Sequence, residues 1–544
     1  MATTAEQDAR KKLFFEMPSF EKTAAFSSLK NYALSPLDLT KEGVISPERI
    51  AKMKALAAGF TCLYGFEKVS DDVLQALFQL ADQRKALIQM QAMQSGEVVN
   101  FIEGVESENR PALHTAMRDI FDAPNSGKAA TNARLLVKKE HEKLKKFIDE
   151  INVQKRFSEM ILIGIGGSEL GPKALYNALS FYQRKDRQVH FIGNVDPDDV
   201  ALTLGSVDLK KTLVVVVSKS GTTLETATNE EFLRSEYVKQ NLNPNEHFVS
   251  ITMPGTPMDD LKRYKAAFYV WDYVGGRYSA TSMVGALLLS FGVGYDEFID
   301  LLKGAHAMDL VALKTDPKEN LPLLSALLGI WNRNFLGYST EAIIPYAQVL
   351  HRFPAHLQQC DMESNGKRID RRGEPCAFET GPIIWGEPGT NAQHSFYQLI
   401  HQGTNIIPLE LIGFIEPQSG HDFEWKGTTS QEKLLSNLFA QAMGLAMGQK
   451  NANPNKVFPG NRPSLLLLAK KLTPYALGAL LSYYENKIAF QGFIWGINSF
   501  DQEGVQLGKV LAEKQLGLFK AEHEGQKAEP FPLGETLLQI SKQV

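Results

Sequence analysis

Short, continuous runs of apolar residues recur through the middle of the chain, and each ends at glycines or polar residues. The first group of runs lies at residues 160–165, 189–193, 212–217, 247–252 and 267–271. Most of these runs are separated by segments long enough for a helix. Strands buried on both faces of a parallel sheet have this composition, because helices cover both sides of the sheet. The alternation predicts a doubly wound α/β domain over residues 125–285.

A second series of apolar runs follows further along the chain. It lies at residues 341–346, 381–385, 405–411 and 492–496, with helical stretches between most of its members. This series predicts a second α/β domain over residues 286–515.

Helical periodicity dominates the two ends of the chain. Residues 71–81 place apolar side chains every three or four positions, so the region 1–124 is predicted to be helical. Residues 133–151 are rich in lysine and have apolar residues at the same spacing, which predicts a surface helix. The tail, 516–544, is charged and ends in a predicted amphipathic helix over 534–542.

Composition excludes several classes of protein. Apolar residues make up 44% of the 544 positions, and 58 basic residues face 62 acidic ones, so nothing suggests a surface that coats nucleic acid. Cys62, Cys360 and Cys376 are the three cysteines, without a Cys-x-x-Cys pair, which disfavours a disulfide framework or a zinc ribbon. No apolar run approaches the ~20 residues that span a bilayer. We expect a soluble cytoplasmic protein without membrane contact.

The first candidate for chemistry is the glycine-rich stretch from Gly164 to Gly171, which includes Gly167 and Ser168. It follows a predicted strand and is expected to open a helix, where free backbone N–H groups can meet an anion. A third glycine is missing for a dinucleotide fingerprint, and no Gly-Lys-Ser/Thr follows for a Walker loop. A simple strand-to-helix turn explains the stretch as well as a ligand site does.

A second candidate follows the valine-rich strand at 212–217. Ser218, Ser220, Thr222, Thr223 and Thr226 supply five hydroxyls beside Lys219. One or two hydroxyls would be enough to cap a helix, so the group favours a site for a monoester phosphate over a cap alone. The absence of a Walker lysine or a metal-ligand cluster suggests that the phosphate is a handle on the substrate.

Four further side chains could complete a site for isomerisation. Arg277 follows a glycine pair and could stabilise an oxyanion or form an inter-domain ion pair, and Glu363 could be the base that moves a proton between adjacent carbons. His394 and His401 lie seven positions apart, on one face of a predicted helix. His394 is the better ligand candidate, and His401 is expected to pack. Lys509 would ordinarily be a solvated surface lysine, but in a pocket it could take part in proton transfer.

These motifs, taken in order, resemble the phosphoglucose isomerase family over essentially the whole chain. The two most specific stretches are Val274-Gly-Gly-Arg-Tyr-Ser279 and 500–509, and 164–168, 363–367 and 389–394 agree in order and context. The resemblance implies two sugar-isomerase (SIS) α/β domains, with a helical N-terminal region and a helical C-terminal tail. It also implies a cofactor-free, metal-free aldose–ketose isomerisation of glucose 6-phosphate and fructose 6-phosphate, in glycolysis and gluconeogenesis, by a homodimer whose sites are shared between subunits.

The resemblance also implies a role for each matching residue. Glu363 matches the base that carries the proton between C1 and C2, and Arg277 the group that stabilises the enediolate. Lys509 and His394 match the groups that open the sugar ring, with His394 contributed by the partner subunit. The residues that match the family's phosphate and substrate contacts are Gly167, Ser168, Ser218, Lys219, Ser220, Thr223, Thr226, Gln359 and Gln502.

Departures from the family pattern concern neighbours of these residues. Ala280-Thr281-Ser282 replaces a frequent Leu-Trp-Ser, Ser220-Gly221 replaces a common Thr-Phe, and Phe500, Glu503 and Gln506 replace frequent Tyr, Trp and Glu. Three other functions have different requirements. A sugar-phosphate sensor need not keep Glu363, His394 and Lys509 together, an amidotransferase-type isomerase would need an N-terminal cysteine, and a metal-dependent isomerase would need a ligand cluster such as His-Glu-x-x-His.

Overall fold

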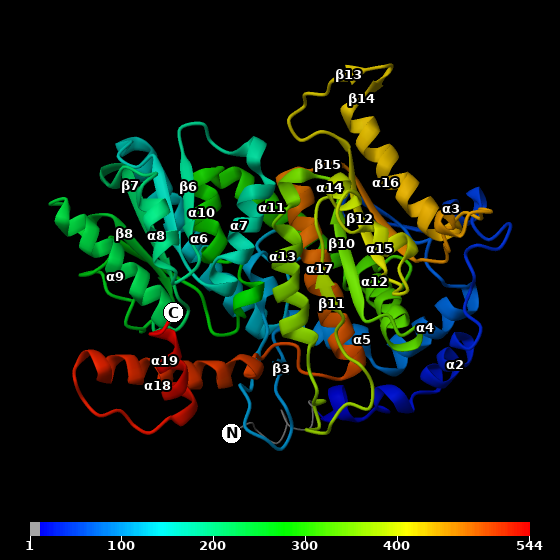
Figure 1. The fold of residues 1–544 in the computed structure, drawn as a ribbon, viewed down its shortest axis with the longest axis horizontal. Coiled ribbons are helices and arrows are strands. Elements are labelled where there is room, and N and C mark those ends of the chain that lie inside the picture. Colours follow the sequence, from blue (N-terminus) through cyan, green and yellow to red (C-terminus); the bar gives the residue numbers. More distant parts are fainter. Residues whose placement is uncertain (1–10) are drawn as a thin grey trace. The chain divides into compact units, whose positions relative to one another are not determined.

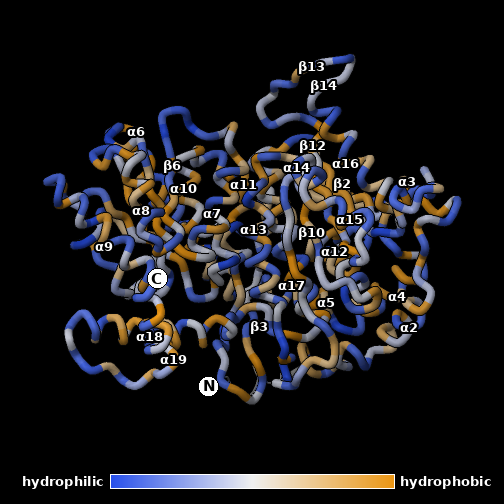
Figure 2. The backbone as a smooth tube through the Cα atoms, in the orientation of Figure 1, coloured by the Kyte–Doolittle hydropathy of each residue, from blue (hydrophilic) through white to orange (hydrophobic). Residues whose placement is uncertain are grey.

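The computed structural model describes residues 11–544, and the chain divides into two compact units, Met1–Ser499 and Phe500–Val544. The larger unit contains two separate, largely parallel sheets, each flanked by helices (Figure 1). Hydrophobic backbone segments run through the strands and the helices packed on them, whereas many peripheral loops are hydrophilic (Figure 2).

The first sheet has five parallel strands in the order β6-β5-β7-β8-β9. Their bounds are β5 Glu159–Ile163, β6 Gln188–Ile192, β7 Thr212–Val217, β8 Phe248–Thr252 and β9 Ala266–Tyr269. Every residue of β7 is buried, which is the reason for its unbroken apolar composition. The helices that alternate with these strands are α6 Lys128–Gln154, α7 Leu170–Ala178, α8 Pro197–Leu204, α9 Leu224–Lys239 and α10 Met283–Gly292.

The second sheet has six strands in the order β1-β2-β15-β12-β10-β11. Their bounds are β1 Lys54–Ala57, β2 Phe60–Leu63, β10 Thr340–Pro345, β11 Ile383–Trp385, β12 Leu409–Glu416 and β15 Ser464–Lys471. The last four strands of this order are parallel, and β2 and β1 extend the sheet in antiparallel fashion. Small hairpins pair β3 Val98–Asn100 with β4 Arg110–Pro111, and β13 Glu424–Trp425 with β14 Thr428–Thr429.

Helices fill the space around the second sheet. Their bounds are α2 Ala24–Ala33, α3 Pro47–Lys52, α4 Asp71–Gln83, α5 Ala86–Ser95, α11 Tyr295–Val311, α12 Leu321–Ile330, α13 Phe353–Gln358, α14 Gly389–Gln393, α15 Tyr397–Gln402, α16 Ser430–Met447 and α17 Pro474–Trp495. Helix α17 packs against both α11 and α12 and is buried along nearly its whole length. It therefore forms the central helix beside the second sheet.

The predicted fold class, with two doubly wound parallel sheets, is confirmed. One predicted strand is wrong, because residues 492–496 form the last turn of α17 and the glycine that ends it. A helix buried on all sides carries apolar residues all round, so a short piece of it resembles a buried strand. The predicted helical region 1–124 also contains β1 and β2, which join the second sheet. The division into domains stays a prediction.

The C-terminal unit is a helical hairpin, as the tail composition suggests. It consists of α18 Gln506–His523 and α19 Pro532–Ser541, and α19 confirms the predicted amphipathic helix within two residues at either end. Gln515 Nε2 donates to the Gly534 carbonyl at 3.2 Å, and Lys542 pairs with Glu522. No helix among residues 11–544 is both long enough and apolar enough to cross a membrane.

A buried cluster of charges ties α17 to the second sheet. Lys487 Nζ lies 2.7 Å from a Glu341 oxygen on β10 and 2.6 Å from a Glu410 oxygen on β12, and all three side chains are buried. Burial raises the pKa of Glu341 to about 8, with Lys487 acting against this and the negative Glu410 adding to it. Burial acts to raise the pKa of Glu410, but Lys487 outweighs it and holds that pKa below its usual value, so at neutral pH Glu341 is the carboxyl that carries the proton.

This proton predicts that stability falls as the pH rises from about 5 to about 8. Folded Glu341 binds a proton that the unfolded chain releases near 4.5, so the folded state binds more protons in that window and loses its advantage as the pH approaches 8. Urea unfolding of the wild type and of Glu341→Gln, measured from about pH 5 to about pH 9, checks this. The difference in unfolding free energy between the wild type and Glu341→Gln should change with pH up to about pH 8 and stay constant above it. Parallel curves would contradict the assignment.

Candidate active site

Two loops meet at the carboxyl ends of neighbouring strands in the first sheet. Strands β5 and β7 pair directly, so the stretch after Ile163 and the stretch after Val217 lie side by side. Ligands of open α/β sheets bind at this edge, where the loops supply backbone N–H groups and short side chains. Both glycine- and hydroxyl-rich motifs of the sequence are therefore placed together.

The first loop touches the segment that carries Arg277. Gly167 is buried, and a Cβ there would lie 2.2 Å from the carbonyl carbon of Gly276, so only glycine allows this contact. Ser279 Oγ donates to the Gly276 carbonyl at 2.7 Å and lies 3.4 Å from the Gly167 carbonyl. Ser168, half-buried, ends a short 3₁₀ turn before α7. The loop thus holds the arginine segment against the end of β5.

The second loop gathers its hydroxyls before α9. Ser218 Oγ lies 2.9 Å from Thr223 Oγ1, and Ser220 Oγ accepts from the Thr222 backbone N–H at 3.2 Å. Thr223 is the N-cap of α9, yet its side chain does not cap the helix, so the first turn keeps backbone donors for an anion. Thr226, one turn further, is buried, and its hydroxyl has no hydrogen-bond partner among the described residues.

Lys219 is placed differently from its neighbours. Its ammonium group donates to the carbonyls of Asp272 and Val274, at 3.0 and 3.1 Å, and so links the hydroxyl-rich loop to the segment that precedes Arg277. Burial lowers the pKa of Lys219 to about 8, and the positive Arg110 lowers it further. The side chain joins two loops of the site.

Arg277 is the centre of the site. Its side chain is only 1% exposed, and three of its nitrogens have separate partners. Nε donates to Ser364 Oγ and Nη2 to the Ser499 carbonyl, both at 2.7 Å, while Nη1 lies 3.3 Å from Glu363 Oε2. A planar guanidinium held at these positions presents a fixed positive charge beside a carboxylate.

Glu363 lies on an irregular turn that continues α13. Residues Gln359–Glu363 form a π-helix, a rare geometry that is frequent at functional sites. The Glu363 side chain is 23% exposed, so it can reach both Arg277 and a ligand from solvent. Gln359 lies close to the first loop, since a Cβ on Gly166 would be 3.3 Å from Gln359 Nε2. The Glu363 carboxylate and the Arg277 guanidinium therefore lie beside the loops that follow β5 and β7.

Comparison with known proteins places the chain in a family. The model of the phosphoglucose isomerase family matches residues 64–529. The chain is 59% identical to a glucose-6-phosphate isomerase of Protochlamydia amoebophila over 516 residues, 95% of this chain and 96% of the relative. It is 54% identical to one of Chlamydia pneumoniae over 94% of this chain and 96% of the relative. The chain belongs to the phosphoglucose isomerase family.

Solved structures agree with this membership. A crystal structure of a glucose-6-phosphate isomerase from Chlamydia trachomatis superposes with a TM-score of 0.92 at 50% identity, covering 96% of this chain and 99% of that one. A hypothetical protein of Thermus thermophilus has a TM-score of 0.65 at 28% identity, covering 82% and 96%. The family expected from the sequence motifs is confirmed.

The two histidines of the predicted helix are separated in this family member. The helix is broken into α14 and α15, so His394 caps the first and His401 lies near the end of the second. The break falls between Gln393 and Tyr397, while Gly389, at the start of α14, packs directly on the Tyr346 ring. His394 is exposed, whereas His401 pairs with Gln441 at 2.7 Å and packs on Phe458, as expected of a packing residue.

Gln502 and Lys509 belong to the C-terminal unit. Gln502 precedes a short 3₁₀ turn, and Lys509 lies exposed in the first turn of α18. The sequence predicts that their motif follows a strand, which is wrong because the preceding element is α17. Their part in the site stays a prediction. Among residues 11–544, no three His, Cys, Asp or Glu side chains are grouped as metal ligands.

Three residues of the site were not predicted from the sequence. Ser364 and Tyr278 stand inside the quoted motifs, next to Glu363 and Arg277, and this adjacency was the available signal. Ser499 contributes its backbone carbonyl, which any residue type could supply, so no sequence signal exists.

Proposed function

We propose that this protein catalyses the reversible isomerisation of D-glucose 6-phosphate and D-fructose 6-phosphate, in glycolysis and gluconeogenesis. The observation that carries the proposal is the Glu363 carboxylate 3.3 Å from the buried Arg277 guanidinium, beside the hydroxyl-rich loop that precedes α9. Its membership of the phosphoglucose isomerase family supports the same reaction and substrate.

The proposed reaction begins with substrate binding and ring opening. The two loops after β5 and β7 hold the phosphate and orient the sugar through Gly167, Ser168, Ser218, Lys219, Ser220, Thr223 and Thr226. Gln359 and Gln502 line the bound sugar. His394 and Lys509 move the proton between the ring oxygen and the hydroxyl on C1, which opens the ring. The phosphate is bound and released unchanged.

Proton transfer then moves the carbonyl group. Glu363 takes the proton from C2, the electron pair forms the C1–C2 double bond, and negative charge develops on O1. Arg277 stabilises this cis-enediolate, because its charge is permanent and its position is fixed before the reaction starts. Glu363 returns the proton to C1 while a proton passes from O2 to O1, leaving the ketose.

The same site favours catalysis over sensing. A sugar-phosphate sensor requires the hydroxyl-rich loop, but it does not require a partly exposed carboxylate held against a buried guanidinium. Glu363 and Arg277 form such a pair here, with the arginine further fixed by Ser364.

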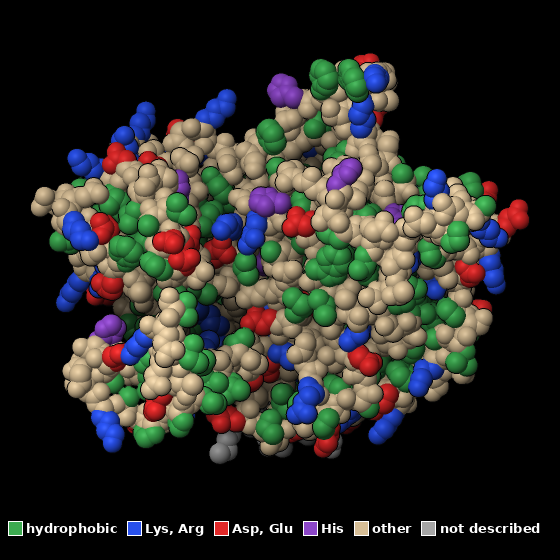
Figure 3. Space-filling view, viewed as in Figure 1, with side chains coloured by type: hydrophobic (Ala, Val, Ile, Leu, Met, Phe, Trp, Pro, Cys, Tyr) green, Lys and Arg blue, Asp and Glu red, His purple; other side chains and the backbone are tan. Residues whose placement is uncertain are grey.

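We also propose a homodimer in the cytoplasm, with His394 of the partner subunit completing each site. The exposed position of His394 and a projecting hairpin support this. Phe423 and Trp425 on the β13–β14 hairpin are 68% and 57% exposed, and Figure 3 shows hydrophobic and basic side chains gathered on that projection. Three free cysteines are compatible with a reducing compartment. Light scattering should give twice the 60.5 kDa of one chain, and an active monomer would contradict the shared site.

A coupled assay tests the reaction. Purified protein, fructose 6-phosphate and EDTA are mixed with NADP and a metal-independent glucose-6-phosphate dehydrogenase. We expect the wild type to form NADPH in the presence of EDTA. With Lys509→Ala, the rate of NADPH formation should fall strongly. Folded protein that binds sugar phosphate without turnover would instead support the sensor.

The hydroxyl-rich loop predicts a loss of substrate affinity when Thr223 is replaced by valine. One charge-assisted hydrogen bond to phosphate is worth ~1.5–3 kcal/mol, which corresponds to a roughly 10- to 150-fold fall in kcat/KM. Inhibition by inorganic phosphate should weaken in parallel. Thr228→Val, one turn further on the exposed side of α9, removes a hydroxyl bonded only to the Leu224 carbonyl and serves as control. Equal behaviour of the two variants would contradict the phosphate site.

A further inference from the structure

The hydroxyl of Ser364 occupies a central place in the site although it follows the proposed base in sequence. Its Oγ accepts from Arg277 Nε at 2.7 Å and lies 2.8 Å from Tyr278 Oη. Ser364 is fully buried, so water cannot replace either partner. Because a guanidinium nitrogen can only donate, one acceptor position of this oxygen is committed to Arg277.

The turn that precedes Ser364 also contacts the backbone of Arg277. Cys360 Sγ donates to the Arg277 carbonyl at 3.3 Å, one helical turn before Ser364. The π-helical geometry of Gln359–Glu363 therefore lets consecutive positions serve different ends of Arg277. Glu363 faces the Nη1 edge while Ser364 holds Nε. The two contacts together fix which edge of the guanidinium faces the base.

The far side of Ser364 is equally fixed. The Tyr278 ring is buried and stacks on the His114 ring at 4.6 Å between centroids, with 18° between planes. Burial, and then the positive Arg118, lower the pKa of His114 to about 3, so the imidazole is neutral and adds no charge behind the tyrosine. The Tyr278 hydroxyl thus remains a rigid, uncharged partner for Ser364.

We infer that Ser364, supported by Tyr278, is a positioning residue that aims the Arg277 guanidinium at the oxygen on which charge develops. This inference rests on the proposed isomerase function and deepens it. Ser364 does not touch the reacting atoms, so it acts through Arg277. A contact that only aims the guanidinium should matter most when negative charge develops, and little when the sugar phosphate first binds.

Steady-state kinetics of Ser364→Ala test the inference. Loss of a buried hydrogen bond to a charged group should lower kcat roughly 10- to 150-fold, with KM within about threefold of the wild type. Binding of 5-phospho-D-arabinonate, whose carboxylate resembles the enediolate, should weaken similarly. Binding of D-glucitol 6-phosphate, which develops no such charge, should hardly change. Ser364→Thr keeps the hydroxyl and should restore most of kcat.

Two further variants keep the test decisive. Tyr278→Phe removes only the hydroxyl on the far side of Ser364 and should lower kcat about 2- to 10-fold, so it tests the same contact if Ser364→Ala folds poorly. Ser290→Ala removes a hydroxyl that is equally buried on α10, away from the site, and should leave kcat unchanged.

Distinct outcomes separate this inference from the proposed function. A wild type that binds both analogues but does not isomerise overturns the function and the inference with it. An active wild type together with a folded, fully active Ser364→Ala overturns the inference alone. Equal weakening of both analogues overturns it as well, because that result is a general loss of the site.

Discussion

Replacement of Glu363 by glutamine is expected to lower kcat by about 10²–10⁴-fold while KM stays near its wild-type value. Glutamine keeps the size of the side chain and a carbonyl oxygen that can accept from Arg277 Nη1, but it cannot take the C2 proton. The amide removes a positioned base and little else. Steady-state kinetics in both directions, with a thermal unfolding curve to establish folding, measure the effect.

Deuterium exchange makes the same prediction specific to proton transfer. In D₂O, a carboxylate that carries the proton between C2 and C1 exchanges part of it with solvent, so the wild type should place deuterium in the product. Glu363→Gln should lose exchange together with turnover. Glu374→Gln, an exposed glutamate further along the chain, is the matched control and should retain both. A Glu363→Gln protein with near-normal turnover would show that another group is the base.

The fold was predictable where burial makes a pattern unambiguous. Strand β7 is buried at every position, so its valine run could be only a core element between helices. Strands β1 and β2 are four residues long and alternate between buried and more exposed positions, which is too short a pattern to detect in a helical region. Helix α17 shows the opposite difficulty, because burial on all sides removes helical periodicity.

The site was predictable as a set of side chains, whereas their orientation was not. Arg277, Glu363 and the Ser218–Thr223 hydroxyls could be named from residue type and from their position after strands. The direction of the Lys219 ammonium depends on the carbonyls of Asp272 and Val274, which any sequence supplies. The π-helical turn before Ser364 depends on tertiary packing. Such features lie in backbone geometry, and the sequence carries no residue code for them.

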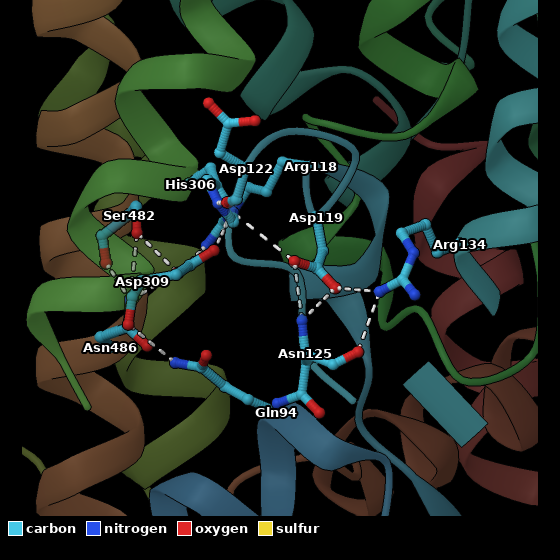
Figure 4. Close-up of polar contacts among 10 residues, drawn as sticks. All are labelled: Gln94, Arg118, Asp119, Asp122, Asn125, Arg134, His306, Asp309, Ser482 and Asn486. Atoms are coloured by element: carbon cyan, nitrogen blue, oxygen red, sulfur yellow. Dashed lines mark hydrogen bonds and ion pairs between the residues drawn. The ribbon is translucent and has the colours of Figure 1, made fainter. Parts of the chain in front are cut away.

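Buried charge behind the site is a second feature that composition conceals. The near balance of acidic and basic residues gives no sign that Arg118 is fully buried. Its Nε and Nη2 contact Asp309 of α11 at 2.6 and 2.8 Å, and its Nη1 contacts Glu485 of α17 at 2.5 Å. Figure 4 shows the neighbourhood of Arg118 and Asp309, where Ser482 and Asn486 also donate to the aspartate. The cluster joins α11, α17 and the segment after His114.

Replacement of Arg118 by methionine is expected to lower the unfolding free energy by about 3–5 kcal/mol. The variant leaves Asp309 and Glu485 without their cation in a position that water does not reach. The Asp309 side chain is 4% exposed and the Glu485 side chain 0%. Burial already raises the pKa of Glu485 to about 7, so this carboxyl can take a proton, whereas Asp309 is held ionised chiefly by Arg118. Urea unfolding at neutral pH measures the loss.

The matched control is an ion pair of the same length at the surface. Lys52 and Asp71 lie 2.7 Å apart, yet both side chains are 66% exposed, so Lys52→Met should cost less than about 1 kcal/mol. Adding Asp309→Asn and Glu485→Gln to Arg118→Met should recover part of the loss, since no buried charge then lacks a partner. If Arg118→Met costs no more than Lys52→Met, solvent reaches the cluster. That result would show that burial does not make the Arg118 ion pairs more stabilising than an exposed pair of similar length.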